Sequence, residues 1–332
     1  MPGSLVGVVL TASREGVPLL TDPLAPLLML AVAAAATPVL VRAIGARAFH
    51  LAALAPLAVL VWAAANWSAV VDGHGPSGSV EWVPALGLTL GLRLDGLSVL
   101  MVGLVAGVGA MVLTYAGSYF DQDDHDDQDD RALGRFGMTM LLFAAAMVGL
   151  VMAEDLFSLF LFWELTSVAS YLLIGTDDRR SAARSGARQA LLITGMGGLA
   201  MLGGFIVLGQ ESGTWSLAVL LSDPPSGRAV DVALLLVLVG ALTKSAQAPF
   251  HSWLPRAMAA PTPVSAFLHS ATMVTAGVYL IARFSGPFSE SVVWRPAVIC
   301  AGGASMLIGG YRALRQHDLK ALLAYGTVSQ LG

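Results

Sequence analysis

Charged residues are scarce in this chain of 332 residues: Asp, Glu, Lys and Arg make up 12% of it, about half of the roughly 25% found in soluble domains. Hydrophobic residues make up 56%, and the mean hydropathy is +0.74. The charge deficit lies in long apolar runs, each near the roughly 20 residues that span a bilayer as a helix. This composition excludes an ordinary soluble domain and indicates an all-α, polytopic membrane protein. Short alternating segments, which predict a membrane β-barrel, are missing.

Cysteine is nearly absent as well. The single Cys300 lies in an apolar run, where it offers neither an intramolecular disulfide nor a metal-site spacing, so we expect it to pack. The sequence also lacks a glycine-rich nucleotide loop after a strand, a Cys/His metal set, and a nucleophile beside an orienting base. We therefore expect no enzyme, no metal site and no cofactor. Residues 1–23 lack the basic segment and clear cleavage site of a signal peptide.

Ten apolar runs predict ten transmembrane helices, at about residues 24–43, 49–67, 96–117, 136–153, 156–174, 186–209, 230–248, 263–282, 293–311 and 318–332. If the first loop is cytoplasmic, 11 arginines lie inside and 5 outside. This bias follows the positive-inside rule and predicts an outside N-terminus. The chain ends at Gly332 within the tenth run, which predicts a fragment of a longer protein.

Three polar or glycine-rich segments have unusual compositions. Residues 121–131 hold seven aspartates and one histidine, which indicates either cation binding or a solvated acidic loop, without the glycine and glutamate of an EF-hand. The basic residues 177–188 are expected to fix topology, with anionic membrane lipid as a contact. Glycines within 195–204 lie in mid-span, so they predict close helix packing rather than a phosphate loop.

Two titratable residues lie deep in apolar runs. Glu164 is eight residues into the fifth run, roughly 12 Å deep, and a carboxylate there needs a basic partner, a water-filled cavity or a proton. Lys244 is about 14 residues into the seventh run, too deep to reach the interface easily. The two residues predict either a pair that handles protons or a static buried ion pair.

A proline follows Lys244 within the same apolar region. Pro249 lacks a backbone donor, so it predicts a break in the seventh helix. Broken helices at membrane depth line cavities and mark ion sites in transporters. His251, beside this break, is either an accessory group or an interfacial residue.

Two further titratable residues follow the break. His269 lies in the eighth run near Thr272 and is either a proton relay or a packing residue. Lys320 begins the tenth run and is either a positive-inside anchor or part of a hydrated helix face. Together with the deeper pair, these groups indicate a membrane protein that moves charge.

Three stretches resemble a known family: FWELTSVASYLLIG at 162–175, TKSAQAPFHSWLPRAMAAPTPVSAFLHSATMVTAGVYLIAR at 243–283, and HDLKALLAYGTVSQLG at 317–332. They are similar to the proton-conducting membrane subunits of respiratory complex I and of Mrp-type multisubunit Na+/H+ antiporters. The resemblance covers roughly residues 90–332. FWELTS, with GGLAMLGGF at 197–205, is most similar to the large A-type component of the Mrp antiporter.

The resemblance implies a fold with two inverted five-helix repeats. In that fold, residues 1–95 form an N-terminal extension with two helices and an outside loop, and residues 96–135 form a third helix with an acidic cytoplasmic loop. Residues 136–283 form the first repeat, and residues 284–332 form the truncated start of the second. It also implies a central proton axis through Glu164, Lys244, His269 and Lys320. Thr275 stands where many of these A-type components carry a lysine in the eighth helix. Proton transfer at that point of the axis would therefore depend on His269 or water.

The function implied is that of a subunit of a plasma-membrane Na+/H+ antiporter, a secondary transporter rather than an enzyme. Its expected partners are the other membrane subunits, Na+, H+ and membrane lipid, with no nucleic acid. Two alternatives stay open. One is a proton-pumping membrane subunit of a complex I-like NADH/quinone oxidoreductase, and the other is a truncated, non-transporting scaffold.

Overall fold

The computed structural model describes residues 21–83, 88–121, 130–270 and 272–332. The expectations for the acidic loop fall mainly outside these residues, as do those for most of residues 1–23. The described part is mainly helical, with one short 3₁₀ helix and one two-stranded sheet. The elements are α1 Ala25–Ile44, η1 Gly45–Arg47, α2 Ala48–Ala52, α3 Leu54–Ala65, α4 Trp67–Val71, β1 Ser77–Val83, β2 Leu88–Arg93, α5 Gly96–Asp121, α6 Asp130–Met152, α7 Leu156–Ile174, α8 Ser181–Ser212, α9 Leu217–Ser222, α10 Arg228–Lys244, α11 Trp253–Ala257, α12 Thr262–Ser270, α13 Thr275–Ser285, α14 Trp294–Ala313 and α15 Leu319–Leu331.

Each predicted apolar run contains helix, and α7 begins and ends where the fifth run does. Within the described ranges, five helical segments are long and apolar enough to cross a membrane: Ala25–Ala65, which contains α1 to α3, and the helices α5, α6, α7 and α8. These segments identify a multi-pass membrane protein. The count of ten spans stays a prediction.

One structural feature differs from the expected all-α chain. Strands β1 and β2 pair antiparallel, with Val80 opposite Leu90 and Ser77 opposite Arg93, in a segment predicted to be an outside loop. Two short strands have few alternating positions, so their pattern is easily missed beside long apolar runs. The Asp155 side chain ties the hairpin to the start of α7, because its carboxylate accepts from Ser158 N at 2.7 Å and from Gly91 N at 2.9 Å.

The predicted eighth helix at 263–282 is also interrupted, since residues 272–274 separate α12 from α13. No proline lies at this point. Instead, Met273 N donates to the carbonyl oxygen of Leu268, five residues back, at 3.1 Å, which is a wider turn than an α-helix makes. The Thr272 hydroxyl donates to Phe267 O and the Thr275 hydroxyl to Thr272 O. These hydroxyls satisfy carbonyls that the interruption frees.

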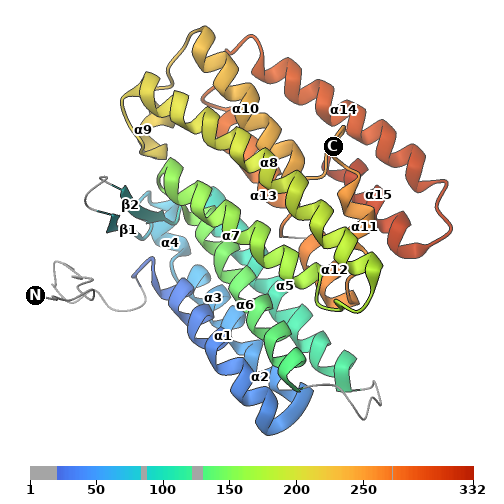
Figure 1. Cartoon of the computed structure of the whole chain (residues 1–332). Coiled ribbons are helices and arrows are strands. Elements are labelled where there is room, and N and C mark those ends of the chain that lie inside the picture. Colours follow the sequence, from blue (N-terminus) through green and yellow to red (C-terminus); the bar gives the residue numbers. More distant parts are fainter. Residues whose placement is uncertain (1–20, 84–87, 122–129, 271) are drawn as a thin grey trace, which may run out of the picture.

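The helices pack as a bundle in which α8 lies between α7 and α10, and α6 lies between α1 and α7 (Figure 1). Helices α14 and α15 pack against each other along one edge, where α15 also contacts α11 and α12. Cys300 of α14, expected to pack, is exposed. The glycine-rich part of α8 allows its close approach to α10: a Cβ on Gly197 would lie 1.8 Å from Thr243 Oγ1. The predicted packing role of the glycines at 195–204 is confirmed at this contact.

Candidate functional site

Lys244 is the last residue of α10 and is fully buried. Its ammonium donates to the carbonyl oxygen of Trp163 and to the hydroxyl oxygen of Ser167, both at 2.7 Å. Its Nζ also lies 5.0 Å from the centroid of the Trp163 ring. These contacts offset part of the cost of removing the ammonium from water. They bring the end of α10 onto one turn of α7.

Glu164 follows Trp163 on that turn and is half-buried. Its Oε1 atom is buried and has no hydrogen-bond partner among the described residues. A Cβ on Gly198 would lie 1.9 Å from this oxygen, so the carboxylate occupies space that the glycine of α8 leaves free. Glu164 and Lys244 interact electrostatically but form none of the ion pairs seen in the described ranges. The structure therefore brings them close together without a direct salt bridge.

Helix α10 ends at Lys244, five residues before Pro249, where the break was predicted. Pro249 lies within the non-helical residues 245–252 that follow. Side chains satisfy backbone groups in this segment and beside it. Ser305 Oγ of α14 accepts from Ala248 N at 2.8 Å, and Ser245 Oγ donates to Val274 O at 2.6 Å. A non-helical segment buried in protein at membrane depth requires such partners. The proline therefore continues the break rather than starting it.

His269, in α12, is buried, and neither ring nitrogen has a hydrogen-bond partner in the part of the chain that the structure describes. Its ring lies 5.9 Å from that of Trp253 in α11, measured between centroids. The indole of Trp253 donates to Thr243 O, next to Lys244, at 2.9 Å. Trp253 thus packs between the histidine and the end of α10. The hydroxyls of Thr272 and Thr275 bond to nearby backbone carbonyls.

Lys320 lies in the first turn of α15, which contacts both α11 and α12. It is half-buried, and its ammonium donates to Ala260 O at 3.1 Å, just before α12 begins. His251 lies in the broken segment, with both ring nitrogens buried and unpartnered among the described residues, and its ring centroid is 6.4 Å from that of Tyr325. The structure thus groups Glu164 with Lys244, connects His269 to them through Trp253, and leaves Lys320 bonded to neither group.

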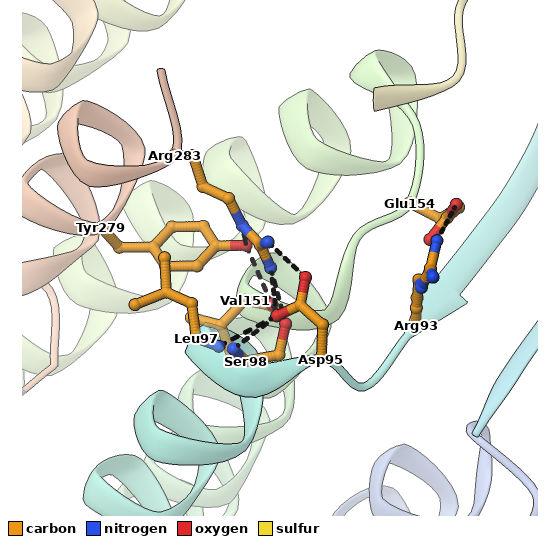
Figure 2. Close-up of polar contacts among 8 residues, drawn as sticks. All are labelled: Arg93, Asp95, Leu97, Ser98, Val151, Glu154, Tyr279 and Arg283. Atoms are coloured by element: carbon orange, nitrogen blue, oxygen red, sulfur yellow. Dashed lines mark hydrogen bonds and ion pairs between the residues drawn. The ribbon is translucent and has the colours of Figure 1, made fainter. Parts of the chain in front are cut away.

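A second polar cluster, absent from the sequence-based candidates, joins α13 to the start of α5 (Figure 2). The guanidinium of Arg283 forms a two-nitrogen contact with the carboxylate of Asp95, with one bond at 2.9 Å, and donates to Ser98 Oγ at 2.7 Å. Arg283 Nε donates to the hydroxyl of Tyr279, which donates to Val151 O at 2.9 Å. The cluster fixes three helices at the end of the bundle that carries the hairpin.

Electrostatics in this cluster favour a charged Asp95. Burial raises the pKa of the Asp95 carboxyl, but the hydrogen bonds and positive charge of Arg283 outweigh burial and hold that pKa below its usual range. Nearby, Arg93 and Glu154 form an ion pair at 3.5 Å. Burial raises the pKa of Glu154 above its usual range, against the opposing effect of Arg93. In the sequence, the pairing of Asp95 with Arg283 is indicated only by their positions, since each is a charged residue at the edge of an apolar run.

Comparisons with known proteins identify sequences related to this chain. Residues 153–332 match the family model described as NADH:quinone oxidoreductase/Mrp antiporter, TM, and residues 82–136 match NADH-Ubiquinone oxidoreductase (complex I), chain 5 N-terminus. The probable A/B component of a K(+)/H(+) antiporter of Rhizobium meliloti is 48% identical over 76% of this chain and 25% of its own length. The A component of the Na(+)/H(+) antiporter of Alkalihalophilus pseudofirmus is 42% identical over 83% of this chain and 34% of its own. The chain thus spans a quarter to a third of these relatives.

Solved structures show the same fold. A chain of the Mrp complex from a Dietzia species is 37% identical and superimposes with a TM-score of 0.83, over 93% of this chain and 33% of its own length. A chain of respiratory complex I from Thermus thermophilus superimposes with a TM-score of 0.74 at 23% identity, over 93% of this chain and 62% of its own. The second likeness concerns the fold alone.

Proposed function

Because this chain belongs to the NADH:quinone oxidoreductase/Mrp antiporter family of membrane proteins, we propose that it forms part of one subunit of a multisubunit Na+/H+ antiporter. The relatives with 48% and 42% identity, named as antiporter subunits, support this choice. The proposed role is the passage of protons, as a secondary transporter. The other membrane subunits of the complex, together with the remainder of this one, would complete the antiporter in the plasma membrane.

The observation that carries the proposal is the fully buried Lys244 ammonium, bonded to a carbonyl and a hydroxyl beside the unpartnered Glu164 oxygen. Neither acceptor is charged, so the lysine can lose a proton without leaving an ion pair broken. The free oxygen of Glu164 offers an acceptor on the same turn of α7. Buried ionisable groups within a membrane bundle are characteristic of ion pathways.

The proposed route continues from Glu164 and Lys244 to His269 and then to Lys320. His269 supports a relay because neither ring nitrogen has a partner among the described residues. In the neutral ring one nitrogen can accept a proton while the other donates one. The first step would cross one helix contact, from α7 to α10. The second would cross two, from α10 to Trp253 of α11 and from Trp253 to His269 of α12. Lys320 would receive protons at the start of α15, through water beside Ala260.

We also propose a topology with ten spans, an outside N-terminus and a first five-helix repeat at residues 136–283. Support comes from the ends of the helices. Arginines expected inside lie at the start of α6, the start of α8 and the end of α14. The hairpin and the Asp95–Arg283 cluster lie at the opposite, outside end.

Substitution in the complete complex tests the proposed route. Everted membrane vesicles containing Lys244→Ala or Glu164→Ala are expected to show Na+-dependent proton flux lower by at least about tenfold. Glu211→Ala is the matched control, because Glu211 is an exposed carboxylate at the far end of α8, and it should leave flux unchanged. Undiminished flux in both route variants, with normal amounts of assembled complex, would refute the route.

A second candidate function is that of a proton-pumping membrane subunit in a redox complex. The match of residues 82–136 to the complex I chain 5 model favours it. The proteins that copurify with the full-length protein distinguish the two functions. Soluble redox subunits and proton flux independent of Na+ would favour the pump, whereas membrane subunits alone and a strict Na+ requirement would favour the antiporter.

A further inference from the structure

Arginines line a hollow at the end of the bundle where α6 and α8 begin. The hollow has a volume of about 550 Å³, and its wall includes Arg135 of α6 together with Arg184 and Arg188 of α8. The half-buried Tyr171 of α7 contributes to the same wall. Asp178 is the one acidic residue among those that line it. The hollow therefore carries an excess of positive charge.

A second hollow adjoins the first through a shared arginine. Its volume is about 420 Å³, and it is lined by Pro38, Arg42, Arg131 and Arg135. Five arginines from α1, α6 and α8 thus surround two neighbouring spaces. An arginine placed only to orient the chain in the membrane can lie anywhere on an inside loop. Placement around two concave spaces indicates recognition of an anion.

The three guanidiniums of the larger hollow form no ion pair with a carboxylate within the described ranges. Arg184 donates instead to the backbone carbonyls of Asp178 and Arg179. A guanidinium presents a planar set of donors that matches the oxygens of a phosphate group. Positive charge in this hollow is therefore available for a phosphate.

We propose that the two hollows joined at Arg135 bind the head group of an anionic phospholipid. Basic pockets between membrane helices on the cytoplasmic side bind such head groups, and the proposed topology places this end inside. Apolar wall residues such as Phe136 and Leu172 would contact the glycerol and upper acyl chains. Two adjoining basic spaces fit a lipid with two phosphate groups, so cardiolipin is the probe of choice.

Lipid binding to the purified complete complex tests the proposal without any measurement of transport. Native mass spectrometry is used to titrate cardiolipin, phosphatidylglycerol and phosphatidylcholine onto the wild-type complex and onto an Arg135→Gln/Arg188→Gln double variant. We expect wild type to favour cardiolipin over phosphatidylcholine, and the variant to bind cardiolipin roughly 25-fold more weakly, at about fivefold for each arginine. An Arg135→Lys/Arg188→Lys variant should retain intermediate affinity.

The matched control is Arg179→Gln/Arg315→Gln, which removes two exposed arginines that lie at the same end but line neither hollow. Its cardiolipin affinity should stay within about twofold of wild type, since it keeps the local contacts and loses only net charge. Equal losses in the two double variants would overturn the site, because they would show a general charge effect. Equal binding of phosphatidylcholine and cardiolipin by wild type would overturn it as well.

Inorganic phosphate distinguishes a lipid from a soluble anion. Millimolar phosphate is added to the wild-type complex already loaded with cardiolipin. Retention of the lipid supports the proposal, whereas its full displacement would show that the hollows bind a free phosphate and would refute the lipid assignment. The thermal unfolding temperatures of all variants are measured in parallel. If the glutamine variant of Arg135 and Arg188 has a lower unfolding temperature than wild type, the Arg135→Lys/Arg188→Lys variant takes its place in the comparison of affinities.

Discussion

The Glu164 carboxylate can occupy its position only because residue 198 is a glycine and has no side chain. A methyl group there would lie 1.9 Å from Glu164 Oε1 and 3.4 Å from Trp163 Cδ1. Ordinary van der Waals contact begins at 3.4 Å, so restoring it in Gly198→Ala moves the oxygen by about 1.5 Å (3.4 minus 1.9). The carboxylate is the free end of a rotatable side chain, which allows this movement without displacement of the backbone.

The expected effect on stability is small and the expected effect on transport is large. Alanine is a better helix former than glycine by roughly 0.8–1 kcal/mol, which offsets the cost of turning the glutamate to another rotamer, about 0.5–1.5 kcal/mol. Misplacement of a reacting group by about 1 Å can lower a rate by up to roughly 100-fold. We therefore expect Gly198→Ala to assemble normally and to lower Na+-dependent proton flux by about tenfold or more.

A control on the same helix and a double variant isolate the cause. Gly195→Ala adds a methyl group to α8 at a point where no described atom outside the adjoining part of that helix lies within 4 Å, so flux should stay at the wild-type level. In a Glu164→Gln background, Gly198→Ala should cause no further loss, because both changes act through one carboxylate. Additive losses, or full activity in Gly198→Ala, would refute a role for the position of Glu164.

Two further predictions concern stability. Asp95→Asn should lower the unfolding free energy by about 1 kcal/mol at neutral pH, a discounted value for hydrogen bonds to a charged group because the Asp95 side chain is 34% exposed. The lowered pKa of Asp95 means that its contribution is fully present above the unfolded value of about 3.9 and is lost as pH falls through the folded pKa. A difference from wild type that does not shrink as pH is lowered below about 3.9 in thermal unfolding would contradict this account. Gly197→Ala should destabilise by roughly 1–3 kcal/mol, because its methyl group would lie 1.8 Å from Thr243 Oγ1. Gly203→Ala, with its nearest contact at 3.9 Å, should be neutral or stabilising in the same assay.

Much of the fold could be predicted because membrane spans are encoded locally. Hydrophobicity over about 20 residues identifies a span without knowledge of its neighbours, and the run 156–174 matches α7 from end to end. The sequence also predicts the break after Lys244, although it indicates Pro249 as the cause. It does not predict the interruption between α12 and α13, because the wide turn and threonine hydrogen bonds there follow no proline or glycine signal.

The cluster of Asp95 and Arg283 shows why some contacts cannot be predicted from local sequence. Arg283 and Asp95 are 188 positions apart, and each looks like an ordinary charge at the end of an apolar run. Their pairing requires α13 to pack beside the start of α5. Only the packing of the whole bundle determines that proximity.

By itself, the sequence determined that this is a multi-pass helical membrane protein with ionisable groups in its spans, because burial of charge in lipid is costly wherever it occurs. The tertiary structure decided which atoms those groups meet. Lys244 bonds to Trp163 O and Ser167 rather than to Glu164, and Glu164 lies against Gly198 instead. Helix propensity and hydropathy act over neighbouring residues, whereas these contacts depend on how closely α7, α8 and α10 approach one another.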